Sequence, residues 1–200
     1  MKELKIYSDG GSHNNGGKKK GEPVWGSYGA IIVKDNKVIY KFQDFYENVT
    51  NNNMELFGFI KAYTEFLKRY KSKEKYHITV ISDSQYLIKG INEWLPGWKK
   101  RRWKNSSGNI IENLYMWKII DKLLVYNPNI ELEFVWQKGH KGKSVSLEEN
   151  PDIYFNEMVD SMATESINEA SNPDKWWFFP EGATFEDHLK KIGNILGVKE

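Results

Sequence analysis

The stretch HITVISDSQYLIKGINEW, residues 77–94, predicts a strand followed directly by a helix. Residues 77–82 are rich in β-branched side chains, which favour a short strand. The helix is expected to begin near Ser84, so Asp83 stands where the strand ends. Ligand sites of α/β proteins collect at the carboxyl ends of sheet strands. The segment therefore predicts an α/β protein with an acidic side chain at the functional edge of its sheet.

Three more strands are expected on the N-terminal side of this segment. They cover residues 2–8, 27–33 and 38–46, and they are separated by a loop rich in Gly, Asn and Lys and by the polar turn KDNK. Short connections favour antiparallel pairing, so we expect the three strands to form a meander.

Helix and strand signals alternate along the rest of the chain. Apolar residues at helical spacing predict helices over 54–70, 110–125 and 156–170. Strict alternation predicts a strand over 130–136, and a long loop is expected over 138–155. Helical crossovers imply parallel pairing of the later strands. The residues themselves therefore predict a mixed sheet flanked by helices.

The composition says more about the chemistry available to the chain than about its binding partners. Its 200 residues suffice for one domain with a modest extension. The chain has no cysteine, which excludes disulfides, cysteine nucleophiles and thiolate zinc sites and fits a reducing, cytoplasmic location. The net charge of +2, from 29 basic and 27 acidic residues, decides little about a nucleic-acid partner. No signal-peptide core or apolar run long enough to span a bilayer is present, so we expect no membrane association.

Four acidic residues stand at positions that are structurally unusual for acids. Asp9 ends the first strand and precedes two glycines, and Asp83 ends the fourth. Glu55 lies in the first turn of a helix for which Asn53 is the expected N-cap, and Asp160 lies inside the last helix among apolar residues. If the first and fourth strands are neighbours, two of these carboxylates reach one edge of the sheet.

Each acid also has an ordinary structural interpretation. An aspartate after a strand is often a turn former or helix cap, which applies to Asp9 and Asp83. Glu55 alone is explained by the helix dipole, and Asp160 alone by solvation on a helix surface. The hypothesis of a shared site therefore rests on the four residues in combination.

Several carboxylates in one place repel one another, so they either take up protons or bind cations. Their hard oxygen atoms suit Mg²⁺ or Mn²⁺ and not zinc. Two such ions about 4 Å apart can activate a water molecule on one side of a phosphodiester and stabilise the leaving oxygen on the other. A chain using this chemistry needs no nucleophile of its own, which is consistent with the missing cysteines.

Five motifs in a fixed order resemble those of type 1 ribonuclease H. They are YSDGG at 7–11, TNNNMEL at 50–56, ISDSQYLIKGINEW at 81–94, WQKGHKG at 136–142 and NEMVD at 156–160. The resemblance covers roughly residues 3–168. It implies the ribonuclease H-like α/β fold, a five-stranded mixed sheet with helices on both faces, in a catalytic domain over 1–170. Two loops, 12–24 with Lys18–Lys20 and 141–155, are longer than in the compact family pattern.

The resemblance also implies an activity and the residues that perform it. The family hydrolyses the RNA strand of RNA–DNA hybrids, leaving a 5′-phosphate and a 3′-hydroxyl. Asp9, Glu55, Asp83 and Asp160 are implied as ligands of two Mg²⁺ ions, with Mn²⁺ as a substitute. His140, in the loop KGHKG, is implied to assist near the scissile phosphate by proton transfer or by easing product departure. Without the resemblance His140 is simply a loop histidine.

A cationic run interleaved with tryptophans is the predicted grip on the substrate. A basic segment with aromatic residues suits nucleic acid, since cations meet phosphates and rings meet sugars. A solubilising charge run is the alternative, but the run also resembles the basic protrusion with which some family members hold the DNA strand. The expected contacts are Trp94, Lys99, Lys100, Arg101, Arg102 and Lys104.

Distinguishing RNA from DNA requires side chains that read the 2′-hydroxyl in the minor groove. Asn51, Asn52 and Gln85 resemble the family positions that do so, and Thr50 resembles the residue that seats a DNA phosphate. Amides both donate and accept, which suits a groove edge. The alternatives are turn chemistry for the asparagines and an ordinary surface role for Gln85.

The tail, residues 171–200, lies outside the resemblance. A helix is expected from about 184 to 196, capped by Thr184, with Phe185, Leu189, Ile192 and Leu196 on one face. The aromatic run Trp176–Phe179 either packs on the domain or docks a protein partner. We expect a monomer.

Two rival functions remain open at this point. One is another nuclease on the same fold, such as a junction resolvase or a transposase-like enzyme. The other is a hybrid-binding module without catalysis. The loop GHKG and the tryptophan-rich basic run argue against the first, and the presence of all four carboxylates argues against the second.

Overall fold

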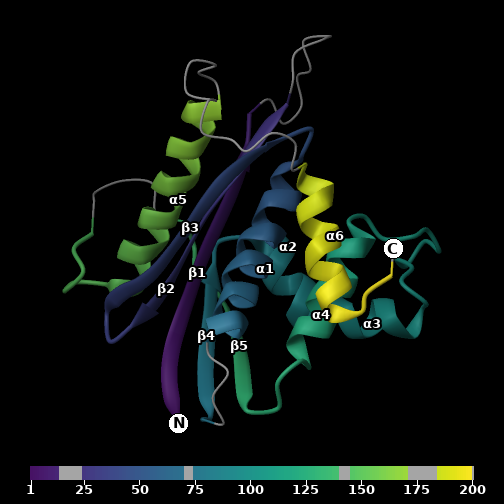
Figure 1. Ribbon diagram of the computed structural model, residues 1–200, viewed down its shortest axis with the longest axis horizontal. Coiled ribbons are helices and arrows are strands. Elements are labelled where there is room, and N and C mark those ends of the chain that lie inside the picture. Colours follow the sequence, from purple (N-terminus) through teal and green to yellow (C-terminus); the bar gives the residue numbers. More distant parts are fainter. Residues whose placement is uncertain (14–23, 70–73, 140–144, 171–183, 200) are drawn as a thin grey trace.

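The sheet has five strands and carries helices on both faces, as predicted (Figure 1). The structure is a computed structural model that describes residues 1–13, 24–69, 74–139, 145–170 and 184–199. The strands are β1 (Lys2–Ser12), β2 (Trp25–Lys34), β3 (Lys37–Glu47), β4 (Tyr76–Ser82) and β5 (Ile130–Trp136). Their order is β3-β2-β1-β4-β5. The first three strands form the expected antiparallel meander, and β4 pairs in parallel with both β1 and β5.

The helices divide unequally between the two faces of the sheet. They are α1 (Asn51–Arg69), α2 (Gln85–Lys89), the π-helical turn η1 (Gly90–Trp94), α3 (Leu95–Lys100), α4 (Leu114–Leu124), α5 (Pro151–Ala170) and α6 (Phe185–Leu196). On one face α1, α2, α4 and α6 enclose the larger apolar core (Figure 1). On the other, α5 covers a smaller core built around Tyr7, Phe155 and Val159.

The first strand is longer than its apolar pattern predicts, so Asp9 lies inside β1 and not at its end. Asp9 pairs with Gly29 and Gly10 pairs with Tyr28, and β1 continues to Ser12. Gly10 permits close packing instead of a turn, because a Cβ atom there would lie 2.4 Å from the backbone nitrogen of Glu55. Gly10 therefore marks the place where α1 crosses the strand.

The start of α1 corrects a second expectation. The helix begins at Asn51, so Asn53 is not its N-cap and Glu55 lies beyond the first turn. The Thr50 hydroxyl accepts a hydrogen bond from the Asn53 N–H (3.2 Å), and Asn53 Oδ1 accepts one from the Thr50 N–H (2.8 Å). This reciprocal pair satisfies backbone donors at the helix start. Three asparagines in succession look like a turn in sequence, but here they form the first turn of the helix.

The helix predicted after Asp83 is confirmed and runs further than expected. The Ser84 hydroxyl caps it by accepting from the Leu87 N–H at 3.1 Å. The chain stays helical through η1 and α3 to Lys100, beyond Pro96. Gly90 permits Trp117 to pack closely against this helical segment, since a Cβ atom there would lie 2.1 Å from the Trp117 ring.

Two later helices differ in length from the sequence expectation. α4 begins at Leu114, four residues later than predicted, because the chain at Asn113 turns through a left-handed conformation with φ 55°. α5 begins at Pro151, inside the stretch expected to be a loop. Asn150 Oδ1 accepts hydrogen bonds from the N–H groups of Asp152 and Ile153, both at 3.1 Å. This side-chain cap adds the first five residues to α5.

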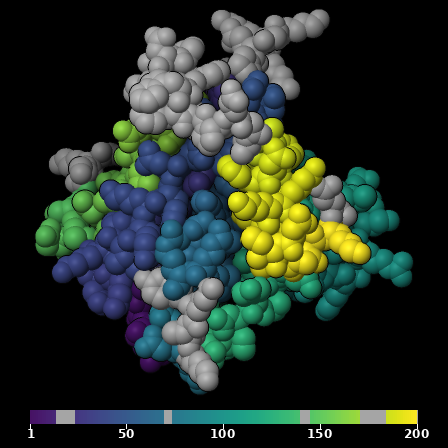
Figure 2. All heavy atoms as spheres, in the orientation of Figure 1, coloured from purple at the N-terminus to yellow at the C-terminus, as the bar shows by residue number. Residues whose placement is uncertain are grey.

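The tail helix α6 is confirmed, with Thr184 and Asp187 forming a capping box. Its buried residues Phe185, Leu189 and Ile192 join the larger core, and the helix lies as a ridge on that side of the molecule (Figure 2). The aromatic run 176–179 lies outside the described residues. Within the described part of the chain, no helix is both long and apolar enough to cross a bilayer.

Candidate active site

Asp9 and Asp83 come together at one edge of the sheet, because β1 and β4 are parallel neighbours. Tyr7 pairs with Ile81, and each aspartate follows two residues later along its strand direction. Asp9 is buried, with 8% of its surface exposed, while Asp83 is half-buried just past the end of β4. The prediction that the first and fourth strands are neighbours is confirmed.

The other two carboxylates reach this edge from opposite faces of the sheet. Asp160, on α5, lies close enough to Asp9 and to Asp83 for the charges to interact. Glu55, on α1, lies close enough to Asp83 for the two charges to interact. The structure thus brings together all four acids that are far apart in sequence.

Crowding and burial change the proton affinities of these acids. Burial, followed by the charges of Asp83 and Asp160, raises the pKa of Asp9 to about 8, although the Gly10 N–H donates to it at 2.7 Å. Burial and the Asp160 charge raise the pKa of Asp83, and burial also raises the pKa of Glu55. Without a cation, a proton held between Asp9 and Asp83 offsets part of their repulsion.

Glu55 is held in place by two neighbours. Asn51, one turn earlier on α1, donates from its amide to one carboxylate oxygen at 2.7 Å. The Ser84 hydroxyl donates a short hydrogen bond to the other oxygen, and both bonds oppose the rise in the pKa of Glu55. Ser84 also caps α2, so one residue fixes both the helix that follows Asp83 and the carboxylate from α1.

Asp83 is held from the side of β5. The Trp136 indole N–H donates to the Asp83 carbonyl at 3.0 Å, and the Gln137 N–H donates to the Ser82 carbonyl at the same distance. A Cβ atom on Gly139 would lie 2.8 Å from Asp83 Oδ2, so the loop after β5 passes directly against this carboxylate. His140 follows Gly139 but lies outside the described residues.

The donor set fits hard divalent cations. All four side chains offer oxygen, and a cation would relieve the repulsion that raises the pKa of Asp9. Among the described residues, no three His, Cys, Asp or Glu side chains form a ready-made metal cage. The fit therefore rests on charge and donor chemistry.

The predicted substrate grip forms a compact unit on α3 and the loop after it. Trp94 is half-buried and packs against Tyr86 and Trp98 at ring distances of 6.2 and 5.6 Å. Lys99 forms an ion pair of 2.6 Å with Asp121 on α4. The remaining predicted cations of this segment are exposed, namely Lys100, Arg101, Arg102 and Lys104.

The predicted minor-groove readers lie at the starts of α1 and α2. Asn51 and Asn52 are half-buried, and Gln85 is exposed as the first residue of α2. Thr50 and Asn51 also have structural partners, Asn53 and Glu55 respectively. Lys18–Lys20 lie outside the described residues.

Comparison with known proteins supports the class of protein that this fold and site define. The fold resembles the prototype foamy virus RNase H domain, with a TM-score of 0.64 and 22% identity over 84% of this chain and 96% of that one. It also resembles LC11-RNase H1, solved in complex with an RNA/DNA hybrid, with a TM-score of 0.57 and 16% identity over 84% of this chain and 99% of that one. The architecture is therefore the ribonuclease H-like fold.

The sequence itself matches the RNase H family model over residues 1–168. It is 34% identical to the ribonuclease H of Ralstonia nicotianae over 84% of this chain and 93% of that protein. It is 35% identical to the ribonuclease H of Cupriavidus necator over 81% of this chain and 99% of that protein. The chain therefore belongs to the RNase H family, type 1, and is a ribonuclease H enzyme.

Some residues around the carboxylates escaped sequence reasoning. Ser84 was expected only as the start of a helix, although its position after Asp83 is a signal for a second role. The contacts of Trp136 and Gly139 with Asp83 had no sequence signal beyond their place in a motif. They depend on the parallel pairing of β4 with β5, which links residues more than 50 positions apart.

Proposed function

We propose that this enzyme hydrolyses the RNA strand of RNA–DNA hybrids with two divalent metal ions. The observation that carries the proposal is the meeting of Asp9, Asp83, Asp160 and Glu55 at one sheet edge, in a crowded all-oxygen group. The ribonuclease H name of its relatives and the hybrid bound to LC11-RNase H1 support the substrate class.

The four carboxylates would hold two Mg²⁺ ions, with Mn²⁺ as a substitute. When bound, the ions supply activation of the attacking water and stabilisation of the leaving oxygen, giving a 5′-phosphate and a 3′-hydroxyl. The chain's own contribution is to hold the ligands: Ser84 and Asn51 orient Glu55, and Trp136 fixes the backbone of Asp83. His140 would move a proton near the scissile phosphate or ease product departure.

Substrate binding would use the cationic segment of α3 and the loop after it. Lys100, Arg101, Arg102 and Lys104 are exposed and suited to DNA phosphates, while Lys99 would first have to leave Asp121. Trp94 would support this segment and offer its half-exposed ring to a sugar.

The predicted minor-groove contacts belong to the same proposal. Asn51, Asn52 and Gln85 would read the 2′-hydroxyls of the RNA strand, and Thr50 would seat a DNA phosphate. Because these contacts recognise sugar and shape, we expect little sequence specificity.

The test is cleavage of a labelled RNA–DNA hybrid with and without Mg²⁺, beside duplex DNA and a four-way junction of matched length. We expect cleavage of the hybrid alone, only with metal, and only in the RNA strand. Preferred cutting of the junction or of duplex DNA would instead identify another nuclease on this fold. Hybrid binding without any Mg²⁺-dependent cutting would identify a non-catalytic module.

Three further expectations stay predictions. The enzyme is expected to be a monomer and cytoplasmic, and the segment 171–200 contains the aromatic run that would pack on the domain or dock a protein partner. Light scattering of the full chain tests the first. Replacing Trp176, Trp177, Phe178 and Phe179 with Ser tests the last, because deleting 171–200 would also remove α6 from the larger core. Loss of thermal stability in this variant would support packing, and retained stability and activity would support docking.

A further inference from the structure

The helix that carries Asp160 is attached at its start to the strand that carries Asp9. Asp152, on the first turn of α5, accepts a hydrogen bond from the Tyr7 hydroxyl at 2.6 Å. The same carboxylate oxygen pairs with the Lys5 ammonium at 2.7 Å. Tyr7 is fully buried and lies two residues before Asp9, so both side chains project from the same face of β1.

The protonation states favour this attachment near neutral pH. Burial would raise the pKa of Asp152, but the hydrogen bonds from Lys5 and Tyr7 outweigh burial and hold the pKa below its usual value. Burial, and then the bond to Asp152, raise the pKa of Tyr7, so its hydroxyl stays a donor. The contact therefore joins a buried neutral donor to a charged acceptor, which is the stronger kind of hydrogen bond.

Two contacts fix the later turns of α5 on β2. Gly29, the partner of Asp9 in the strand register, lets the helix approach so closely that a Cβ atom there would lie 2.4 Å from the Val159 carbonyl oxygen. One turn further on, the buried Ser27 hydroxyl donates to the Ala163 carbonyl at 2.6 Å. Asp160 lies between these two contacts, eight residues after Asp152.

We propose that Tyr7 and Asp152 are positioning residues that set where Asp160 stands relative to Asp9. A helix rises about 1.5 Å per residue, so Asp152 is about 12 Å from Asp160 along the axis and acts through a rigid element. Because β1 carries both Tyr7 and Asp9, the strand that holds Asp9 also holds the residue that fixes the helix of Asp160. This inference rests on the proposed two-metal function and deepens it.

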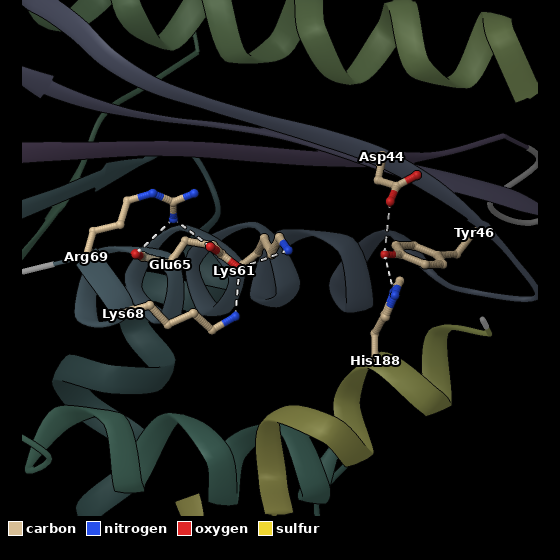
Figure 3. Close-up of polar contacts among 7 residues, drawn as sticks. All are labelled: Asp44, Tyr46, Lys61, Glu65, Lys68, Arg69 and His188. Atoms are coloured by element: carbon tan, nitrogen blue, oxygen red, sulfur yellow. Dashed lines mark hydrogen bonds and ion pairs between the residues drawn. The ribbon is translucent and has the colours of Figure 1, made fainter. Parts of the chain in front are cut away.

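The test compares two buried tyrosines that each donate to an aspartate. Tyr7→Phe removes the bond to α5. Tyr46→Phe removes the hydroxyl that contacts Asp44 at 3.3 Å and His188 at 2.7 Å, on the opposite face of the sheet (Figure 3). Both changes delete one buried hydroxyl, so a general loss of stability should be similar. Only Tyr7→Phe should change the metal site.

Three measurements separate positioning from stability. Loss of an outer partner of a metal ligand typically weakens metal affinity about 10–100-fold, and we expect Tyr7→Phe to raise the half-maximal Mg²⁺ concentration for cleavage by about 10-fold. The rise in melting temperature on adding Mn²⁺ without substrate should shrink in parallel. Amide hydrogen exchange should increase over 153–160. Tyr46→Phe should leave all three unchanged. Asp152→Ala, which removes the acceptor of the Tyr7 hydroxyl, should match Tyr7→Phe, and the two changes together should not add.

The outcomes distinguish this inference from the proposed function. An active wild type whose Tyr7→Phe variant keeps its Mg²⁺ requirement, Mn²⁺ response and exchange pattern overturns the positioning role alone. A wild type that does not cleave hybrids overturns the proposed function, and hydrogen exchange then still decides whether Tyr7 holds the start of α5. Equal changes in Tyr7→Phe and Tyr46→Phe would mean that both hydroxyl contacts contribute only to general stability.

Discussion

The two faces of the sheet are held by different kinds of contact. On the α1 face, several helices share one extended core with fully buried aromatics such as Trp117 and Phe57. On the α5 face, one helix covers a small core and is additionally held by Tyr7, Ser27 and the absence of a side chain at Gly29. Stability is therefore concentrated on the α1 face.

Both faces nevertheless supply carboxylates of the proposed metal site to the same edge. Glu55 comes from the well-packed α1, and Asp160 comes from α5. Burial of apolar surface is non-directional, whereas hydrogen bonds and close backbone contacts fix a particular alignment. We therefore expect changes on the α5 face to reduce activity more than stability, and changes on the α1 face to do the reverse.

The largest effect is expected where both faces meet, at Asp83. Asp83→Asn should abolish cleavage, because the variant loses the carboxylate charge that interacts with both Glu55 and Asp160. Since the pKa of Asp83 is raised in the folded protein, its ionised form opposes folding at neutral pH, and the variant should melt at the same or a higher temperature. Hybrid binding without metal should be retained or tighten.

Cleavage rates, calorimetry and binding assays check this expectation. Asp35→Asn, at an exposed carboxylate in the β2–β3 turn, is the matched control and should behave as wild type. Undiminished cleavage by Asp83→Asn would end the two-metal proposal.

Glycine substitutions test the comparison between the faces directly. Gly29→Ala places a methyl group 2.4 Å from the Val159 carbonyl and should push α5 away from β2, at a cost of about 1–3 kcal/mol in unfolding free energy. Gly10→Ala should cost a similar amount by pushing against α1 at the Glu55 nitrogen. If contacts on the α5 face align the proposed metal ligands, Gly29→Ala should lose more activity than Gly10→Ala when the two variants have lost the same stability.

Gly11→Ala is the control for both glycine variants, because its added methyl group would meet neighbouring atoms only at 4.0 Å. Urea unfolding and cleavage rates of the three proteins make the comparison. Proportional losses of stability and activity in Gly10→Ala and Gly29→Ala would mean that the two faces do not differ in this respect.

The sequence allowed the topology and the four acids to be predicted, for a physical reason. Alternation and helical periodicity are local, and the order of elements restricts how strands pair, so the position of Asp83 at the end of β4 followed directly. The first and last residues of the helices were harder to predict from the sequence. The start of α5 depends on a cap by Asn150, and the start of α1 on a reciprocal bond between Thr50 and Asn53.

Other side-chain contacts between distant parts of the chain could not be predicted. The hydrogen bond between Asp152 and Tyr7 joins residues 145 positions apart. The segment that contains Asp152, ENPD at 149–152, looks like an ordinary turn in the sequence. The same holds for the packing of α5 on Gly29, because a glycine in a strand has several explanations until its neighbour is known.

A smaller effect is expected from the cationic segment after α3. Replacing Lys100, Arg101, Arg102 and Lys104 with Ala should raise the KM for hybrid and flatten the dependence of log K on log salt, by up to about 0.9 per lost phosphate contact. Lys99→Ala should change the slope less, since Lys99 is paired with Asp121. Stability should change little, as these four cations are exposed. An unchanged salt slope would remove this segment from the substrate interface.

The smallest expected effect is a pH dependence at the edge of the larger core, where α6 meets β3. Burial lowers the pKa of His188, against the opposing influence of Asp44, so the folded protein disfavours the charged imidazole (Figure 3). The unfolded chain then binds more protons, and stability rises with pH through the window below the usual histidine value of about 6.5. His188→Gln removes this dependence.

The difference between the melting curves of wild type and His188→Gln isolates that contribution. Wild type should lose more stability than the variant as the pH falls from about 7 to 5, while the Mg²⁺ requirement for cleavage at neutral pH stays equal. Parallel pH profiles would show that the imidazole does not affect the attachment of α6. A changed Mg²⁺ requirement would show that the larger core also aligns the metal ligands, which would contradict the division between the two faces.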